Sequence, residues 1–160
     1  MAIRRLGPNL HINLLGLTAC TRTQKKLLKT KLPVILAGDF NVMPTDIDVY
    51  APDRWRDDAL FRPEVRKAYA DLVRQGWNDA VRTLHPDERI YTFWKYFRGA
   101  FARNAGLRID HLLLSPDLTK HLKSSGVDKF ARSWEKTSDH APVWITLENM
   151  KLKPSIRKGA

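Results

Sequence analysis

The chain has 160 residues, of which 43% are hydrophobic, and its formal net charge is +11. This length suits one domain, and this apolar fraction excludes a largely disordered chain. The single cysteine, Cys20, excludes a disulfide framework and a multi-cysteine metal site. No apolar run reaches the length of a membrane span, so we expect no membrane partner.

The positive charge is concentrated at the two ends of the chain. Residues 1–31 hold seven basic residues and no acid, and residues 149–160 hold four basic residues and no acid, which accounts for the whole surplus of +11. We therefore expect a basic leader (1–31), a domain that is neutral overall (32–148) and a basic tail (149–160). Such ends either bind nucleic acid or stay solvated, and the sequence leaves both open. The leader is a poor export signal, so we expect a cytoplasmic protein.

The first half of the chain predicts helices around one strand. In chain order these are a short basic helix over 22–31, a strand over 33–38, a long connection over 39–61, a helix over 63–75 and a helical turn over 78–84. Helix 63–75 is the clearest, because Pro63 suits a first helical turn and Gly76 suits a C-terminal cap.

The second half of the chain predicts more strands with mostly short connections. In order these are a strand over 90–94, a loop over 95–106, a strand over 107–114, a helix from 116 to about 123, and strands over 127–134 and 141–147. Ser115 and Pro116 form the helix start, as an N-cap residue followed by proline. The whole pattern predicts an α+β fold.

Polar side chains stand at or within three of these strands. Asp39 and Asn41 follow the strand 33–38 one residue apart, so in extended chain they would share one face. Asp110 interrupts the apolar run "LRIDHLLL", where an acid is unfavourable unless it is paired or binds a cation. An ion pair with Arg108, on the same strand face, is the simpler explanation of Asp110.

The third polar group, Asp139 and His140, lies just before the last strand. A lone histidine is more often structural than functional. A catalytic triad of Ser138, Asp139 and His140 is geometrically poor, because adjacent side chains diverge. Taken with the other two groups, however, these side chains suit a hard divalent cation, Mg²⁺ or Mn²⁺, with a phosphate bound to it. The set predicts metal-assisted hydrolysis of a phosphodiester.

Aromatic and basic residues interleave in "YTFWKYFRGAFARNAGLR" (91–108), which contains no acid. This pattern suits contact with a phosphate backbone and an exposed base or sugar. The alternative is that Tyr91, Phe93 and Trp94 belong to the core and the arginines are only solvated.

The motifs "GDFN", "GLRIDHLL" and "SDHAPV", in this order, resemble the exonuclease III/apurinic endonuclease family, within the endonuclease/exonuclease/phosphatase superfamily. The resemblance covers about residues 32–147. It implies that Asp39 orients or deprotonates the attacking water and that Asn41 holds this water and a phosphate oxygen. It further implies that His140 contacts the phosphate with Asp110 as its partner, and that Asp139 binds the metal.

The resemblance also implies a DNA interface. Phe93, Leu107 and Ile109 would line a pocket for an extruded abasic sugar, and Arg98, Arg103 and Asn104 would lie on a DNA-facing loop. The implied protein is a Mg²⁺-dependent DNA-repair nuclease acting on double-stranded DNA, at abasic sites and 3′ ends. An inactive DNA-binding remnant and a phosphodiesterase with a non-DNA substrate remain the alternatives.

Family members supply an asparagine, a metal-binding glutamate and a tyrosine from an N-terminal half that the leader 1–31 does not resemble. We therefore expect a truncated domain, the C-terminal half of a four-layered α/β sandwich: a mostly antiparallel sheet with helices on one face. One half alone would expose the inner face of its sheet. This predicts an unstable chain, one that needs a missing half, or self-association through the exposed face.

Overall fold

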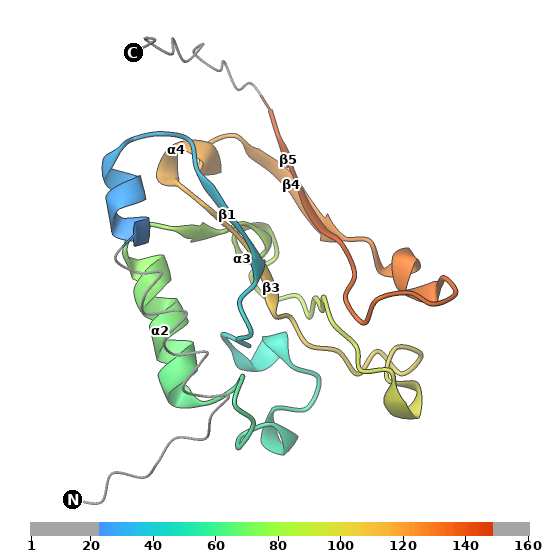
Figure 1. Cartoon of the computed structure of the whole chain (residues 1–160). Coiled ribbons are helices and arrows are strands. Elements are labelled where there is room, and N and C mark those ends of the chain that lie inside the picture. The colour runs from blue at the N-terminus through green and yellow to red at the C-terminus, as the bar shows by residue number, and fades with distance from the viewer. Residues whose placement is uncertain (1–22, 149–160) are drawn as a thin grey trace, which may run out of the picture.

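The computed structural model describes residues 23–148, and its strands form two antiparallel sheets (Figure 1). The first sheet has the order β1-β3-β2, and the second pairs β4 with β5. The strands are β1 (Ile35–Asp39), β2 (Asn78–Asp79), β3 (Asp110–Leu114), β4 (Leu122–Val127) and β5 (Val143–Leu147). The predicted mixture of helices and antiparallel sheet is confirmed.

The helices are short except for one. Residues 23–29 are helical, and the other helices are α2 (Pro63–Arg74), α3 (Ala80–Leu84) and α4 (Pro116–Thr119). Single 3₁₀ turns cover Asp46–Asp48, Pro52–Arg54, Phe97–Gly99 and Lys129–Ser133. The helix at 23–29 and α2 lie on the same side of β1 (Figure 1).

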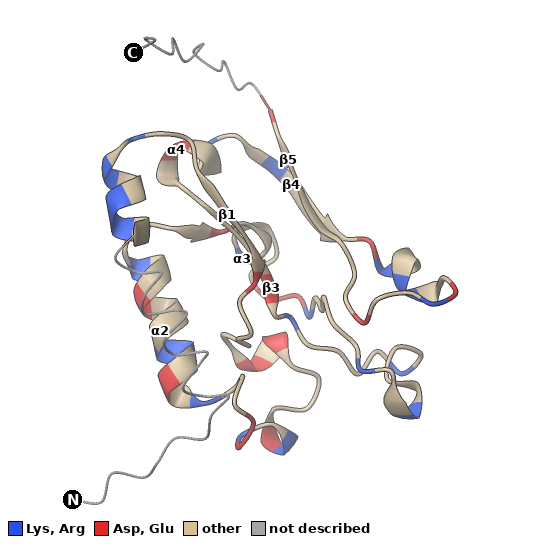
Figure 2. Ribbon diagram, in the orientation of Figure 1, with Lys and Arg blue, Asp and Glu red and all other residues tan. Residues whose placement is uncertain are grey.

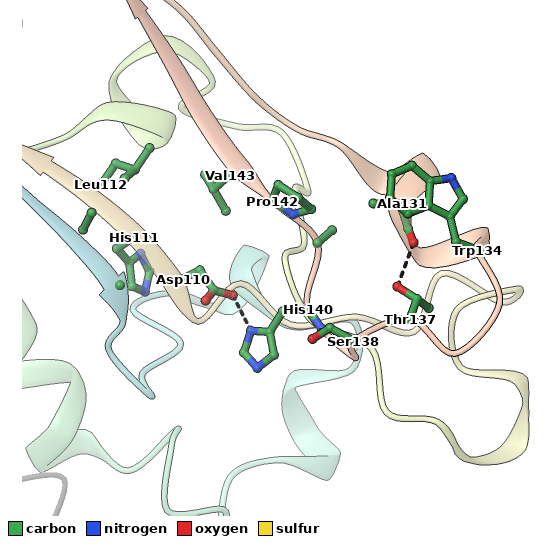
Figure 3. A pocket seen from close by; sticks show the side chains of 13 residues that line it. Asp110, His111, Leu112, Ala131, Trp134, Thr137, Ser138, His140, Pro142 and Val143 are labelled. Carbon is green, nitrogen blue, oxygen red and sulfur yellow. Dashed lines mark hydrogen bonds and ion pairs between the residues drawn. The ribbon is translucent and has the colours of Figure 1, made fainter.

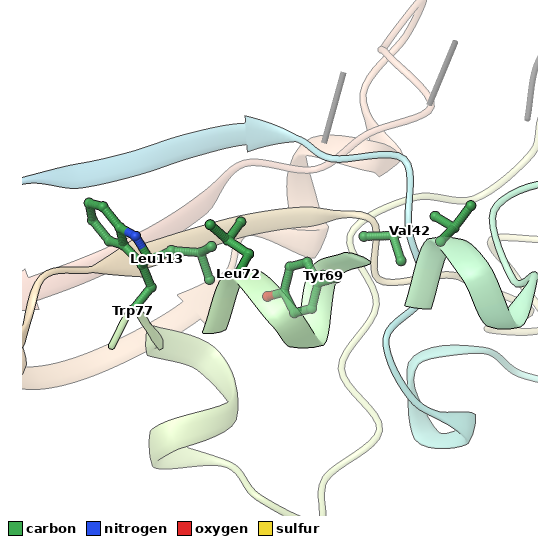
Figure 4. Packing of buried hydrophobic residues seen from close by; sticks show 6 residues of the cluster. Val42, Tyr69, Leu72, Trp77 and Leu113 are labelled. Atoms are coloured by element: carbon green, nitrogen blue, oxygen red, sulfur yellow. The ribbon is translucent and has the colours of Figure 1, made fainter. Parts of the chain in front are cut away.

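The main core lies between α2 and the first sheet. Tyr69 and Leu72 of α2 pack with Leu113 of β3, Val42 and Trp77, and all five side chains are buried (Figure 4). Leu27 and Leu28, which lie in the predicted basic helix, also pack against this cluster. Burial of such side chains supplies most of the stability of a small sheet packed on one helix.

Two local predictions in the first half are confirmed. The predicted helix 63–75 is α2, which begins at Pro63 and ends at Arg74. The predicted turn over 78–84 contains α3, and the carboxylate of Asp79 caps it by accepting the backbone N–H of Arg82 at 3.1 Å. Local signals were sufficient in both cases because capping and helical spacing act within a few residues.

The predicted strand 90–94 is wrong. In this segment Phe93 alone makes bridges, to Leu107 on one side and to His140 on the other. The aromatic residues that suggested a strand are there for packing, since Tyr91 and Trp94 are buried. The predicted strand 107–114 is likewise shorter, because β3 begins at Asp110.

The predicted helix to residue 123 and the predicted strand 127–134 are also wrong. The helix ends at Thr119, and the chain then forms β4, Leu122–Val127, before the 3₁₀ turn Lys129–Ser133. Gly126 lies inside β4 rather than at a helix end. A Cβ atom there would lie 2.6 Å from the Trp144 ring, so glycine allows the indole of β5 to pack closely across the pair.

The predicted leader lies mainly outside the described residues, and the predicted tail lies entirely outside them. The domain boundaries at residues 31 and 149 stay predictions. Within residues 23–148, no helix combines the length and apolar character needed to cross a membrane.

A cavity of about 470 Å³ opens between the two sheets (Figure 3). Ala37 of β1, Leu112 of β3 and Val143 of β5 line it, and we call it the open cavity. Ile35 lies two residues before Ala37 and therefore on the same face of β1, where it is 43% exposed. This apolar face is the one that the sequence predicted to be uncovered.

We propose that the chain self-associates through this face. An Ile35→Lys substitution places a charge on the face, and we expect it to weaken self-association about ten-fold or more, since burial of one isoleucine contributes roughly 1.5–3 kcal/mol. Light scattering over a concentration series measures this change. Thr146→Lys, at an exposed position of β5, is the control and should not change association. A monomeric wild-type chain at every concentration would contradict the proposal.

Candidate active site

The register between β1 and β3 brings two carboxylates together. Asp39, the last residue of β1, lies directly opposite Asp110, the first residue of β3. The backbone pairing of β1 with β3 continues one residue beyond the strands, where the N–H of Phe40 donates to the carbonyl of Ile109 at 3.0 Å. Two acids far apart in sequence are thus fixed at one end of the first sheet.

His140 joins this pair of acids from the segment before β5. Its Nδ1 lies 2.8 Å from Oδ2 of Asp110, and Figure 3 shows the two side chains pointing toward one another. Because an ionised carboxylate only accepts hydrogen bonds, Nδ1 carries the proton. The imidazole is therefore held in one orientation, with Nε2 turned away from Asp110. A ring contact with Phe93, 5.0 Å between centroids, supports the same orientation.

Asp39 and Asn41 form a tight turn after β1. The backbone N–H of Asn41 donates to Oδ1 of Asp39 at 2.8 Å, and Asn41 adopts a left-handed backbone with φ of 50°. Asparagine tolerates this conformation better than most residues. Desolvation by the surrounding protein raises the pKa of Asp39, and the negative charge of Asp110 adds to this, although the N–H of Asn41 acts against it.

These groups surround a cavity of about 400 Å³, which we call the site cavity. Asp39, Asn41 and His140 belong to its polar part. Phe93, Leu107 and Ile109 contribute apolar surface to the same cavity. His140 also borders the open cavity, so its imidazole lies between the site cavity and the open cavity.

A second cavity of about 380 Å³, the loop cavity, continues from the site cavity. Arg98 and Arg103 line it from the predicted DNA-facing loop, whose charged residues are all basic (Figure 2). Arg98 has a left-handed backbone, φ 56°, which is uncommon for a residue other than glycine. The two cavities share Phe93 and Leu107, so a ligand bound at His140 could extend toward the arginines.

Two predicted residues lie elsewhere. Asn104 is exposed and accepts a hydrogen bond from Nε1 of Trp94 at 3.3 Å, so it helps to shape the loop, and it lines neither cavity. Asp139 precedes His140, and its backbone carbonyl accepts the N–H of Trp94 at 2.9 Å.

The ion pair suggested between Asp110 and Arg108 is wrong. Arg108 is 1% exposed and donates to Asp48 at 2.6 Å and to Asp79 at 2.7 Å. The sequence argument assumed regular alternation, but the strand begins only at Asp110, so Arg108 turns to the other side. Asp110 remains available to His140. A triad of adjacent residues is excluded, because the partner of His140 comes from β3.

Comparison with known proteins places this arrangement in a family. Residues 13–140 match the model of the endonuclease/exonuclease/phosphatase family. The chain belongs to this family. It is 36% identical to the DNA repair nuclease APEX1 of Danio rerio over 121 residues, which cover 75% of this chain and 38% of that protein. It is 37% identical to exodeoxyribonuclease III of Haemophilus influenzae over 119 residues, covering 70% of this chain and 45% of that protein.

Solved structures of family members share the fold. An AP endonuclease from Archaeoglobus fulgidus has a TM-score of 0.83 at 33% identity, and the match covers 87% of this chain and 55% of that one. The 3′ phosphatase NExo from Neisseria, bound to a product DNA hairpin, has a TM-score of 0.80 at 34% identity, with 82% and 51% covered. The chain thus spans about half the length of these family members.

Nucleases of the family depend on a divalent metal. Within residues 23–148, however, no three His, Cys, Asp or Glu side chains are arranged to hold a metal ion together. Asp39, Asp110 and Asp139 therefore do not complete a metal site by themselves.

Trp55, Asp58 and Lys95 border both the site cavity and the loop cavity, and sequence reasoning missed all three as site residues. Lys95 Nζ lies 4.5 Å from the centre of the Trp55 ring, which is a cation–π contact. The segment "DRWRDD" could have indicated Trp55, because an aromatic residue between arginines is unusual in an irregular connection. Its place at the cavity depends on how residues 39–61 fold back, which no local pattern predicts.

The raised pKa of Asp39 predicts that the site reduces stability at neutral pH. A folded-state pKa above the unfolded value means that ionised Asp39 disfavours the folded state, so protonation as the pH falls relieves this effect. We expect Asp39→Asn to increase the free energy of unfolding at pH 7, measured by urea denaturation. The gain should shrink as the pH is lowered through the raised pKa of Asp39. Equal stability of the two proteins at pH 7 would contradict this assignment.

Proposed function

We propose that this chain carries the phosphodiesterase site of a DNA-repair nuclease of the exonuclease III type, which cuts beside abasic sites and trims 3′ ends. The observation that carries the proposal is the His140–Asp110 pair beside Asp39 and Asn41, at the wall of a cavity that continues into a basic loop. The names of the related proteins, a DNA repair nuclease and an exodeoxyribonuclease, support it. The proposed location is the cytoplasm.

The proposed chemistry is the attack of water on a phosphodiester. Asp39 takes a proton from the attacking water, and Asn41 holds this water and one phosphate oxygen. His140, fixed through its Nδ1 by Asp110, presents Nε2 to the phosphate. The new bond forms between the water oxygen and phosphorus, and the bond from phosphorus to the leaving sugar oxygen breaks. The leaving oxygen then takes up a proton from solvent water, and Asp39 releases the proton it accepted to solvent, so that the protons balance.

The proposed cofactor is Mg²⁺, with Mn²⁺ as the alternative, and Asp139 is the proposed ligand. A divalent cation would neutralise charge on the phosphate. The proposed DNA contacts are Arg98 and Arg103 to phosphates and Phe93, Leu107 and Ile109 to an extruded abasic sugar. Asn104 is also a proposed DNA contact, since it is exposed on the loop and its accepted bond from Trp94 leaves its amide NH2 group available as a donor.

A non-catalytic DNA-binding module is the second candidate function. It is favoured by the incomplete set of metal-binding side chains within residues 23–148. In that case the arginine loop would still bind duplex DNA while no bond is cut. The two candidates share the loop cavity and differ in whether the proposed catalytic and metal-binding residues act, which are Asp39, Asn41, Asp110, Asp139 and His140.

Incision of a labelled duplex that contains one abasic site separates the two candidates. We expect Mg²⁺-dependent incision that is lost with chelator and with Asp139→Ala. His140→Ala and Asp110→Asn should reduce the rate about 10²- to 10⁴-fold, as for removal of a positioned acid–base group. His121→Ala, at a histidine that contacts the carbonyl of Glu148, is the control and should be unchanged. Absence of incision by folded wild-type protein would favour the binding module.

Salt dependence of duplex binding tests the loop. Loss of each phosphate contact reduces the slope of log K against log salt by about 0.9. We expect Arg98→Ala/Arg103→Ala to weaken binding, and to reduce the slope accordingly, as measured by fluorescence anisotropy. Lys67→Ala/Arg74→Ala on α2 removes the same charge and should leave the slope unchanged. Equal slopes for the two double variants would favour a non-DNA substrate.

A further inference from the structure

A buried ionic network adjoins the candidate site, and none of its members lines the site cavity. It joins four segments of the chain. The two cations are Arg82 and Arg108, the two carboxylates are Asp48 and Asp79, and the neutral members are Thr45, Tyr69 and His111. With two positive and two negative groups, the network is balanced in charge, as burial requires.

Arg108 and His111 lie on either side of the catalytic candidate Asp110, and both reach the loop that follows β1. Arg108 donates to the carboxylate of Asp48 at 2.6 Å, and its backbone N–H donates to the carbonyl of Asp48 at 2.8 Å. His111 contacts the carbonyl of Val42 through Nε2 at 3.0 Å. Loop 40–48 is therefore bound at two points, to Arg108 in the segment before β3 and to His111 within β3, one on each side of Asp110.

The contacts of His111 determine where its proton is. Arg108 Nη1 lies 3.1 Å from Nδ1 of His111, and a guanidinium can only donate, so Nδ1 is the acceptor. The proton of the neutral ring is therefore on Nε2, which donates to the carbonyl of Val42. Burial and then the charge of Arg108 lower the pKa of His111 to about 4, so this neutral form holds at pH 7.

Asn41 is the residue that these contacts hold in place. Its left-handed backbone is unfavourable for most residues, and the carbonyl that follows it, that of Val42, is the one that accepts from His111. His111 also packs against the ring of Phe40, 5.6 Å between centroids, so both neighbours of Asn41 contact the same imidazole.

We propose that His111 and Arg108 are positioning residues, which hold Asn41 against the Asp39 carboxylate and opposite the Asp110–His140 pair. Their significance for catalysis rests on the function proposed above, but their effect on Asn41 does not. A network of buried ions contributes little stability compared with apolar packing of the same volume. A network beside the site is therefore better explained by a role in holding the turn at Asn41 in one conformation. This turn has polar groups on both sides and needs such support.

The test compares three substitutions by NMR, on protein without metal or DNA. His111→Met removes both hydrogen bonds, whereas His111→Gln offers one acceptor and one donor and should restore them. We expect the exchange rate of the Asn41 backbone amide to rise about ten-fold or more in His111→Met and to stay near wild type in His111→Gln. Leu118→Ala, in a separate core cluster, is the control for general destabilisation and should leave the exchange rate of the Asn41 amide near wild type.

If His111→Met does not fold, Thr45→Val provides the milder test, because it removes one hydrogen bond to Asp48 of 2.6 Å. It should also raise the exchange rate of the Asn41 backbone amide, but by a smaller factor. Where the chain incises DNA, kcat should fall about 10- to 100-fold in His111→Met, while KM for the duplex stays the same. An unchanged Asn41 amide in His111→Met, or an equal change in Leu118→Ala, would overturn the proposal. Absence of incision affects only the proposed function.

Discussion

Arg108 fixes the relation between the two halves of the candidate site. Its guanidinium is fully buried and must satisfy its charge within the protein, which it does through Asp48 and Asp79. Burial works to raise the pKa of Asp48, but Arg108 and Arg82 outweigh it and lower that pKa to about 2. The carboxylate is therefore ionised at neutral pH, and the loop after β1 is bound to the segment that leads into β3.

This constraint leaves Asp110 without a buried cation and thereby available to His140. The site then contains carboxylates whose charges are not fully compensated, because Asp39 lies opposite Asp110 at the end of the sheet. Burial, with the charge of Asp110 in addition, raises the pKa of Asp39 and so increases the affinity of this carboxylate for a proton. The local loss of stability and the proposed chemistry thus have one cause.

The surroundings of the site divide into two kinds of space. On one side the site cavity leads into the loop cavity, where arginines and aromatic residues suit a phosphate backbone. On the other side the open cavity separates the two sheets and is bordered by Leu112 and Val143, with His140 at its edge. Polypeptide that covers this apolar face would therefore contact the imidazole. The completeness of the site and the covering of the face are physically linked.

The sequence by itself determined the elements that depend on neighbours a few residues away. Helix α2 follows from its apolar spacing and Pro63, and α3 follows from the capping carboxylate of Asp79. The polar residues after β1, within β3 and before β5 were also recognisable, because acids, amides and histidines are unusual at strand ends. The resemblance of three ordered motifs then indicated the family.

Only the tertiary structure decided which of these residues act on one another. Asp110 pairs with His140, 30 residues away, because the register of β1 with β3 and the path of residues 127–140 bring them together. Arg108 lies only two residues before Asp110 but pairs with Asp48 and Asp79 instead, where its charge is balanced. Trp55 and Lys95 are likewise brought into contact by the tertiary fold, at the border of the site cavity and the loop cavity. Pairing over long sequence separations depends on how buried charge and apolar surface are satisfied across the whole domain, and no local pattern contains that information.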